Sequence, residues 1–296
     1  MKRKVLLSSV VASTLTASSF MTSGAFAKSF AKRMLYREGI DRSEEGWYEE
    51  LGAIKVKIKN HKNMFLQGYL VERQDAKRTV ICLHALLKSS SSLLETAKFF
   101  MDLYDDANIL LYDANAHGLS DGYIRGLGKK DVFDLMYFNT YLLQRYGDNH
   151  RIVMYGQGVG ANTILNTAGL NKLKNVDLII SEGAYDNAYH YLIERCNEEM
   201  KIPNVLCGPA IRKVYLEELK VDIKKLDTVD SVKNNTIPTV FVHSKNDKDS
   251  MFDMVFALYN SNSSEKFLFP IKENYLYEMN QNTEYFHSFK EFLKNH

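Results

Sequence analysis

The sequence lacks a strong excess of charge of either sign. Its formal net charge is +2, and residues 1–27 hold three basic side chains and no acidic one, so residues 28–296 carry −1. A chain this close to neutrality has no sequence signature of the electropositive surface that binds nucleic acid or an anionic membrane. We therefore expect neither kind of partner on electrostatic grounds.

Cysteine is also scarce, and its spacing excludes the common metal sites. Cys82 lies within an apolar run, as expected for a small buried side chain. Cys196 and Cys207 either pair as a disulfide in an oxidising compartment or remain free thiols. Asp247 and Asp249 offer two carboxylates without further ligands, too few for a metal site. We expect no metal and no cofactor.

The N-terminal segment lacks the uninterrupted apolar run of about 20 residues that a membrane-spanning helix needs. Basic residues 2–4 precede an apolar stretch that serines and threonines interrupt, and Ala25-Phe26-Ala27 follows as a small-residue cleavage site. No cysteine lies nearby for lipoprotein attachment. The pattern predicts a signal peptide over 1–27, cleaved after Ala27, and a secreted or cell-surface protein. The alternative is an uncleaved anchor, the one case in which we expect membrane association.

Beyond this segment no internal repeat stands out, and short apolar runs alternate with helix-like runs. We expect a helix or arm over 28–50. Strands are expected over 53–58, 64–71, 79–83, 108–112, 152–155, 176–180, 239–242 and 267–269, and helices over 92–103, 129–146, 159–169, 251–258 and 282–293. Buried strands that alternate with helices favour a mostly parallel sheet covered on both faces.

The turn between the fifth strand and its helix is rich in glycine. Gly156-Gln157-Gly158-Val159-Gly160 has the context of a G-x-S-x-G nucleophile elbow, in which a strand turns sharply into a helix. The central position is Gly158, which has no atom that can attack a carbonyl. Glycine also relieves the backbone strain that a positive φ imposes on other residues at such a turn.

Three further segments support a resemblance to a known family. Leu83-His84-Ala85 resembles an H-G turn, residues 112–122 resemble a D-x-R-x-H-G-x-S-x-G segment, and residues 242–247 resemble an H-G-x-x-D segment. From Thr79 to Leu293 the chain resembles a bacterial α/β-hydrolase family with serine-aminopeptidase-like and lysophospholipase-like members. The resemblance implies an α/β-hydrolase fold, with a mostly parallel central sheet and helices on both faces.

The resemblance also implies a small helical cap. The interval 185–238 interrupts the strand–helix alternation and contains helix-like runs over 187–200 and 210–219. We expect this insertion to cover the carboxyl ends of the strands within a single domain over 28–296. The alternative is two longer connecting helices.

The catalytic triad that the resemblance implies is degenerate. Its acid position is Asp247, its nucleophile position is Gly158, and its histidine belongs near Asn274 or Tyr275, yet no histidine lies between residues 269 and 283. Serine, histidine and acid act as one unit, and losing the nucleophile costs on the order of 10⁶ in rate. We therefore expect Gly158, Asp247 and Asn274 to be vestigial positions.

One part of the implied machinery needs no serine. Backbone N–H groups of Val159 and of Ala85 or Leu86 would form the oxyanion hole, and the following helix directs its positive end there. We expect the pocket to retain the capacity to hold a carboxylate, phosphate or carbonyl oxygen.

These features predict a non-catalytic, secreted or cell-surface protein that binds a small molecule or a protein partner. The alternative is an ester or peptide hydrolase with a different nucleophile, for which the candidates are the serine run 89–92, Ser120 and Ser181. His84 and His117 are expected to be structural loop residues. A purely structural surface protein is a third possibility.

Overall fold

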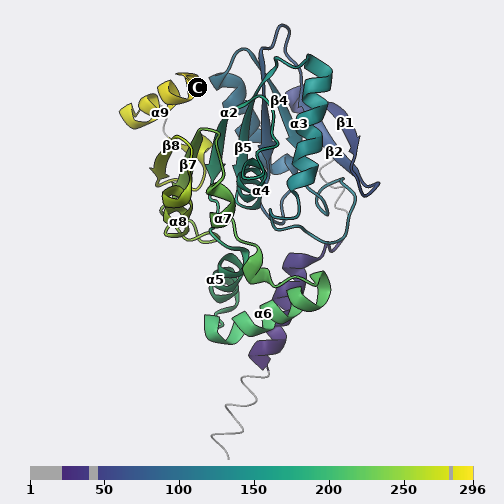
Figure 1. Cartoon of the computed structure of the whole chain (residues 1–296), viewed down its shortest axis with the longest axis vertical. Coiled ribbons are helices and arrows are strands. Elements are labelled where there is room, and N and C mark those ends of the chain that lie inside the picture. Colours follow the sequence, from purple (N-terminus) through teal and green to yellow (C-terminus); the bar gives the residue numbers. More distant parts are fainter. Residues whose placement is uncertain (1–21, 40–45, 280–282, 296) are drawn as a thin grey trace, which may run out of the picture.

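The computed structural model describes residues 22–39, 46–279 and 283–295 (Figure 1). Its centre is an eight-stranded sheet in the order β1-β2-β4-β3-β5-β6-β7-β8. The β1–β2 and β2–β4 pairs are antiparallel, and every pair from β4 to β8 is parallel. The mostly parallel sheet predicted from the sequence is therefore confirmed.

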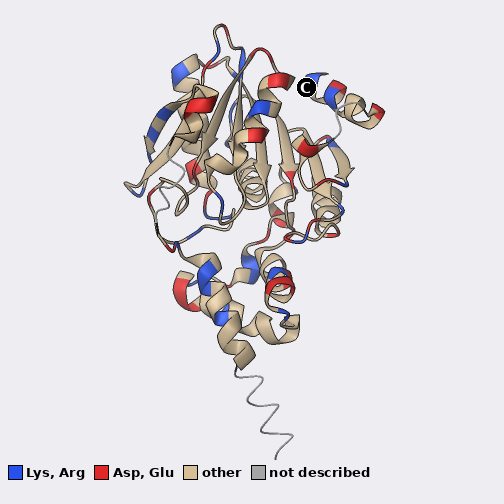
Figure 2. Ribbon diagram, turned by 180° about the vertical axis from the view of Figure 1, so that it is seen from behind, with Lys and Arg blue, Asp and Glu red and all other residues tan. Residues whose placement is uncertain are grey.

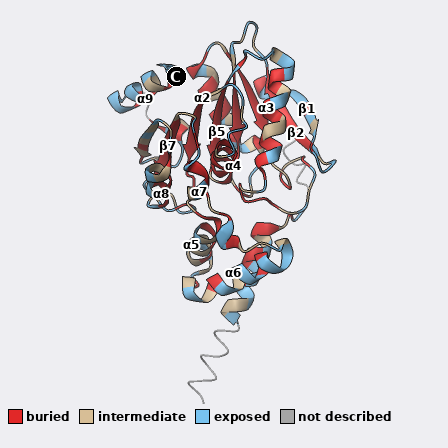
Figure 3. Cartoon of the chain, in the orientation of Figure 1, coloured by how far each residue is buried: buried red, intermediate tan, exposed pale blue. Residues whose placement is uncertain are grey.

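All eight expected strands are present. They are β1 (Ile54–Lys59), β2 (Phe65–Val71), β3 (Arg78–Leu83), β4 (Ala107–Tyr112), β5 (Arg151–Gln157), β6 (Val176–Glu182), β7 (Thr239–Ser244) and β8 (Lys266–Ile271). The central strands are buried on both faces because helices cover each side, so their sequences are continuous apolar runs (Figure 3).

Helices lie on both faces of the sheet (Figure 1). They are η1 (Trp47–Leu51), η2 (Ser90–Leu93), α2 (Leu94–Leu103), α3 (Val132–Tyr146), α4 (Val159–Ala168), α7 (Val229–Val232), α8 (Met254–Ser261), η4 (Leu276–Glu278) and α9 (Glu284–Asn295). The side chains of β3 alternate between the two covers. Cys82 packs into the cluster that includes α2 and α9, and Ile81 into the one that includes α3, α4 and α8.

A third apolar cluster lies outside the sheet layers. It joins α5 (Ala188–Met200), α6 (Asn204–Leu219) and η3 (Ile223–Lys225) to the helix over 22–35. These elements gather at one end of the sheet (Figure 1), where the sequence predicts a cap. We call these four helical elements the cap and their apolar cluster the cap cluster. Acidic and basic positions are interspersed over both the cap and the sheet layers (Figure 2).

The predicted start of the second cap helix is wrong. The sequence places it at residue 210 because proline disfavours helix interiors, but α6 begins at Asn204 with Pro209 inside it. Proline removes a single backbone hydrogen bond there. Buried Cys207, Ile211 and Tyr215 fix the helix against its neighbours, and this packing outweighs the local preference.

The predicted cleavage site lies inside the helix over 22–35. Residues 1–21 of the predicted signal peptide are outside the described residues, whereas Ala27 is fully buried, and Phe30 and Met34 also belong to the cap cluster. Cleavage after Ala27 would leave residues 28–35 of this helix in place, and it stays a prediction. Within the described ranges, no helix is both long and apolar enough to span a bilayer.

The two cap cysteines are free thiols in contact with each other. Cys196 on α5 and Cys207 on α6 are both buried. The hydrogen bond between the two sulfurs raises the pKa of Cys196 and lowers that of Cys207.

This contact predicts a disulfide on mild oxidation. Closing so short a loop should raise the free energy of unfolding by about 2 kcal/mol. Chemical denaturation of the oxidised and reduced protein measures the difference, with Cys207→Ser as the control that cannot cross-link. Equal stability of the two wild-type forms, with the disulfide confirmed by mass, would contradict the prediction.

Candidate functional site

The turn between β5 and α4 has the geometry of a nucleophile elbow. A Cβ on Gly156 would lie 2.5 Å from the amide nitrogen of Ala161, and one on Gly160 would lie 2.5 Å from the carbonyl oxygen of Leu83. Both glycines are therefore required for the close approach of strand and helix. Gly158, at the apex, has φ 52° and ψ −115°, a conformation that strains any other residue.

The space above Gly158 is open. A Cβ at this position would meet only Ala85, with the nearest atom at 3.5 Å, which is an ordinary contact. A serine side chain would therefore fit sterically, and its absence leaves the elbow without a nucleophile.

A cavity of about 320 Å³, here called the elbow cavity, adjoins this apex. The three vestigial triad positions Gly158, Asp247 and Asn274 all line it, and so does Ala85 from the loop after β3. The full lining is Ala85, Gln157, Gly158, Glu182, Gly183, Tyr191, Asn246, Asp247, Lys248, Asp249, Ser250, Asn274 and Tyr275. No histidine is among these lining residues, so the imidazole of the implied triad has no counterpart there.

Asp247 follows β7 and is held by the turn that contains it. Its Oδ1 accepts hydrogen bonds from the amides of Asp249 (2.8 Å) and Ser250 (2.9 Å). Its Oδ2 accepts no hydrogen bond from the described residues and lies 3.8 Å from Nε2 of His243. Burial raises the pKa of Asp247. The acid position thus keeps one free oxygen atom.

His243 does not replace the missing triad base. Its ring is fully buried in β7, and its Nε2 donates to the carbonyl oxygen of Ser250 at 2.8 Å. Burial lowers the pKa of His243, and the residue does not line the elbow cavity. It therefore supports the Asp247 turn and cannot reach a bound molecule.

Glu182 is a second buried carboxyl at this edge of the sheet. It ends β6, accepts a hydrogen bond from the Tyr155 hydroxyl, and accepts another from the amide of Leu276 at 2.7 Å. Burial raises its pKa to about 7, and the nearby Asp247 adds to this rise. The sequence analysis missed Glu182, although its position at the carboxyl end of an apolar strand could have indicated it.

The residues expected to form the oxyanion hole do not all line the elbow cavity. Ala85 lines the elbow cavity, whereas the side chains of Leu86 and Val159 are buried in the cap cluster. Val159 is the first residue of α4 and follows Gly158 directly. The cap closes the site through Tyr191 of α5, whose ring stacks on Tyr185 at 4.4 Å between centroids.

The other candidate nucleophiles do not line the elbow cavity. Ser120 donates to the carbonyl oxygen of Asp113, and Ser181 is buried within β6. Ser89, Ser91 and Ser92 border a second cavity together with His117, but Nε2 of His117 has no hydrogen-bond partner within the described ranges. Among the same residues, no group of three or more His, Cys, Asp or Glu side chains is arranged to hold a metal ion.

The raised pKa of Glu182 predicts a pH-dependent stability. A carboxyl whose pKa rises from 4.5 to about 7 on folding favours the folded state when protonated, so its contribution is full below pH 4.5 and falls as the pH rises through 7. Between pH 4.5 and 8 the loss is about 3 kcal/mol. Urea unfolding at pH 5 and pH 8 should show a smaller difference for Glu182→Gln than for the wild type.

Glu217→Gln, at an exposed carboxylate, is the matched control and should retain the wild-type pH dependence. An unchanged pH dependence in Glu182→Gln would show that this carboxyl is ionised in the folded protein.

No family model matches the chain. Among curated proteins, the uncharacterised protein YqkD of Bacillus subtilis (strain 168) is 26% identical over 258 residues, which cover 84% of this chain and 81% of YqkD.

Solved structures of hydrolases also resemble the chain. The esterase Pf2001 of Pyrococcus furiosus has a TM-score of 0.68 at 17% identity, covering 87% of this chain and 96% of the esterase. The α/β hydrolase GrgF of Penicillium sp. sh18 has a TM-score of 0.58 at 16% identity, covering 82% of this chain and 96% of GrgF. Sheet order, elbow and these neighbours agree, and the chain has the α/β-hydrolase fold.

Proposed function

We propose that this protein is a non-catalytic member of its fold, secreted or held at the cell surface, that binds a small molecule in the elbow cavity. The observation that carries the proposal is Gly158 at the apex of an otherwise preserved elbow. A hydrolase of this kind needs an attacking hydroxyl and a base to accept its proton. At the elbow the nucleophile position is Gly158, and the histidine position is Asn274.

The charges of the elbow cavity favour a ligand with a protonated amine. Three carboxyl side chains line it, Glu182, Asp247 and Asp249, against a single cationic one, Lys248. The sequence suggests that the pocket could hold a carboxylate, a phosphate or a carbonyl oxygen. The carboxyl groups of the lining would repel a carboxylate or a phosphate, but they would not repel an uncharged carbonyl group. Oδ2 of Asp247 is the acceptor for the ammonium group.

The same ligand can use the remains of the oxyanion hole. Its carbonyl oxygen would accept hydrogen bonds from the N–H groups of Val159 and of Ala85 or Leu86, near the positive end of α4. The cavity volume of about 320 Å³ suits a molecule the size of an amino-acid amide. The ligand would then be bound by the same backbone N–H donors that a hydrolase uses to stabilise its reaction intermediate, but no reaction would follow.

Export is the second part of the proposal and rests on the signal-peptide pattern of residues 1–27. An exported protein would meet an oxidising environment. The thiols of Cys196 and Cys207 are in contact. Whether they form a disulfide in the native protein would therefore indicate whether the protein resides in an oxidising compartment.

A fluorophosphonate probe tests the absence of catalysis. We expect no labelled serine in the wild type. We also expect no ester hydrolysis by Gly158→Ser, since the base is still missing, and about 1 kcal/mol lower stability from the positive φ at the apex. Labelling is read by peptide mass spectrometry, and an active serine esterase is the positive control.

Stoichiometric labelling of one wild-type serine would favour the alternative, a hydrolase with an unrecognised nucleophile. The serines beside His117 are the sites to inspect, because they share a cavity with an imidazole.

The ligand class is tested by comparing leucinamide with N-acetylleucine in calorimetry at about pH 7, where an α-amino group is mostly protonated. We expect the amide to bind and the acid not to bind, and Asp247→Asn to weaken amide binding about tenfold or more through loss of a charge-assisted hydrogen bond. Asp253→Asn, at an exposed carboxylate outside the cavity, is the matched control. Tighter binding of the acid, or equal affinity of both variants, would contradict the proposed ligand.

A further inference from the structure

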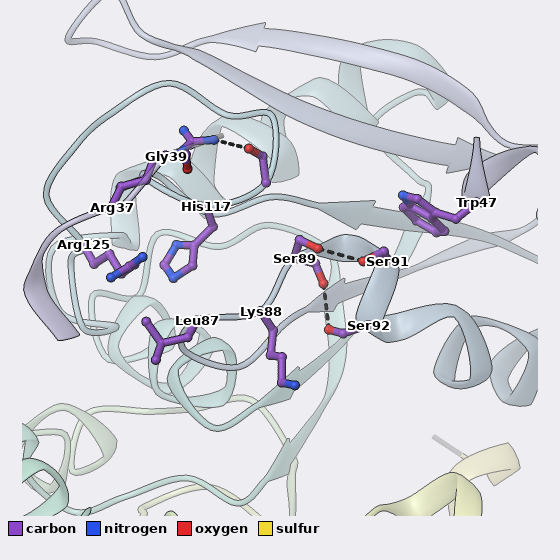
Figure 4. Close-up of a pocket in the computed structure, with 12 residues that line it drawn as sticks. Arg37, Gly39, Trp47, Leu87, Lys88, Ser89, Ser91, Ser92, His117 and Arg125 are labelled. Atoms are coloured by element: carbon purple, nitrogen blue, oxygen red, sulfur yellow. Dashed lines mark hydrogen bonds between the residues drawn. The ribbon is translucent and has the colours of Figure 1, made fainter. Parts of the chain in front are cut away.

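A second cavity, of about 660 Å³, has a lining in which every charged side chain is basic (Figure 4). We call it the arginine cavity. Its lining consists of Arg37, Gly39, Trp47, Leu87, Lys88, Ser89, Ser91, Ser92, Ala116, His117, Gly118 and Arg125. Three of these side chains are cationic and none is acidic. None of the twelve residues lines the elbow cavity.

Backbone carbonyls hold the two arginines in place. Arg37 donates to the carbonyl oxygens of Gly39 at 2.8 Å, Ser120 at 2.6 Å and Gly118. It is 9% exposed, and no described carboxylate forms an ion pair with it. The nearest acidic groups, Asp113 and Asp121, each accept backbone N–H bonds. Carbonyl oxygens orient the guanidinium but carry no net charge, and the carboxylates of Asp113 and Asp121 offset part of its positive charge.

Arg125 is also held by backbone carbonyl oxygens, and its Nε–H group is an additional hydrogen-bond donor. Its Nη1 donates to the carbonyl oxygens of Arg33 (2.8 Å), Met34 (3.3 Å) and Tyr36, which tie the cavity to the helix over 22–35. Its Nε is buried and has no partner within the described ranges, and the residue is 7% exposed. A buried donor without an acceptor destabilises the folded protein, and an acceptor atom of a ligand would remove that penalty.

His117 adds an unpartnered acceptor beside Arg125 (Figure 4). Its Nδ1 donates to the carbonyl oxygen of Asn115 at 2.9 Å, so in the neutral ring Nε2 carries the lone pair. Nε2 is buried without a partner among the described residues, and the side chain is 6% exposed. Burial, His84 and Arg125 together keep the pKa of His117 well below its ordinary value, so the ring is neutral.

We propose that the arginine cavity binds a phosphate monoester. A monoanionic phosphate ester presents charged oxygens to Arg125 Nε and Lys88 and a P–OH proton to His117 Nε2, so it satisfies both orphaned atoms at once. A carboxylate or a sulfate ester has only acceptor atoms and leaves the imidazole nitrogen unpaired. The hydroxyl groups of the serine run border the same space, and Trp47 provides an aromatic wall for the organic part (Figure 4).

The test is calorimetry of the full chain at pH 5, below the second phosphate pKa of about 6, so that the monoanion predominates. Phenyl phosphate, phenyl sulfate and benzoate are the probes. We expect phenyl phosphate to bind at least tenfold more tightly than the other two. Lys88→Ala should weaken phenyl phosphate binding three- to tenfold, while Lys248→Ala, its counterpart in the elbow cavity, should leave it unchanged. His117→Phe should abolish the preference for phosphate over sulfate.

If His117→Phe does not fold, the phosphate affinities of Lys88→Ala and Lys248→Ala still test whether the arginine cavity is the binding site. No binding of phenyl phosphate, equal affinity of the two lysine variants, or equal affinity for phosphate and sulfate in the wild type would each overturn the proposal. Because the two cavities share no lining residue, this outcome is independent of amine binding at the elbow.

Discussion

The close approach of strand β5 and helix α4 is the constraint on which the rest of the site depends. Gly156 and Gly160 leave no room for a Cβ, so backbone packs directly on backbone at the turn. This packing forces Gly158 into a positive φ at the carboxyl edge of the sheet. The positive-φ apex therefore persists although no serine occupies it. Under the proposed function, the scaffold keeps the cavity, the backbone donors and the cap for binding alone.

The two cavities differ in the charge of their lining side chains, and for this reason we propose a cationic ligand for one and an anionic ligand for the other. Carboxyl groups at the ends of β6 and β7 make the elbow cavity acidic, and their raised pKa values reflect the cost of burying them. Arginines fixed by carbonyl oxygens make the second cavity basic. Within the described part of the chain, each cavity keeps an atom without a hydrogen-bond partner, Asp247 Oδ2 in the first and His117 Nε2 in the second. Ligands of opposite charge would satisfy them.

The central strands were predictable because burial on both faces leaves continuous apolar runs, and the first strand was predictable from its alternation of apolar residues and lysine. The elbow was predictable because a turn this tight requires glycine. Three features were not. Helix α6 begins before Pro209 because packing in the cap overrides a local preference. Glu182 and the second cavity depend on contacts between segments far apart in the chain, such as Arg125 with the helix over 22–35, and no local pattern encodes such contacts.

The central claim is that the fold persists here without a reacting side chain. Intact-protein and peptide mass spectrometry after incubation with an activated ester, p-nitrophenyl acetate, measures this directly. The account predicts no stoichiometric acyl group on any serine that lines either cavity. A single acyl-serine that forms in the native protein, disappears on hydrolysis and is lost on unfolding would contradict it.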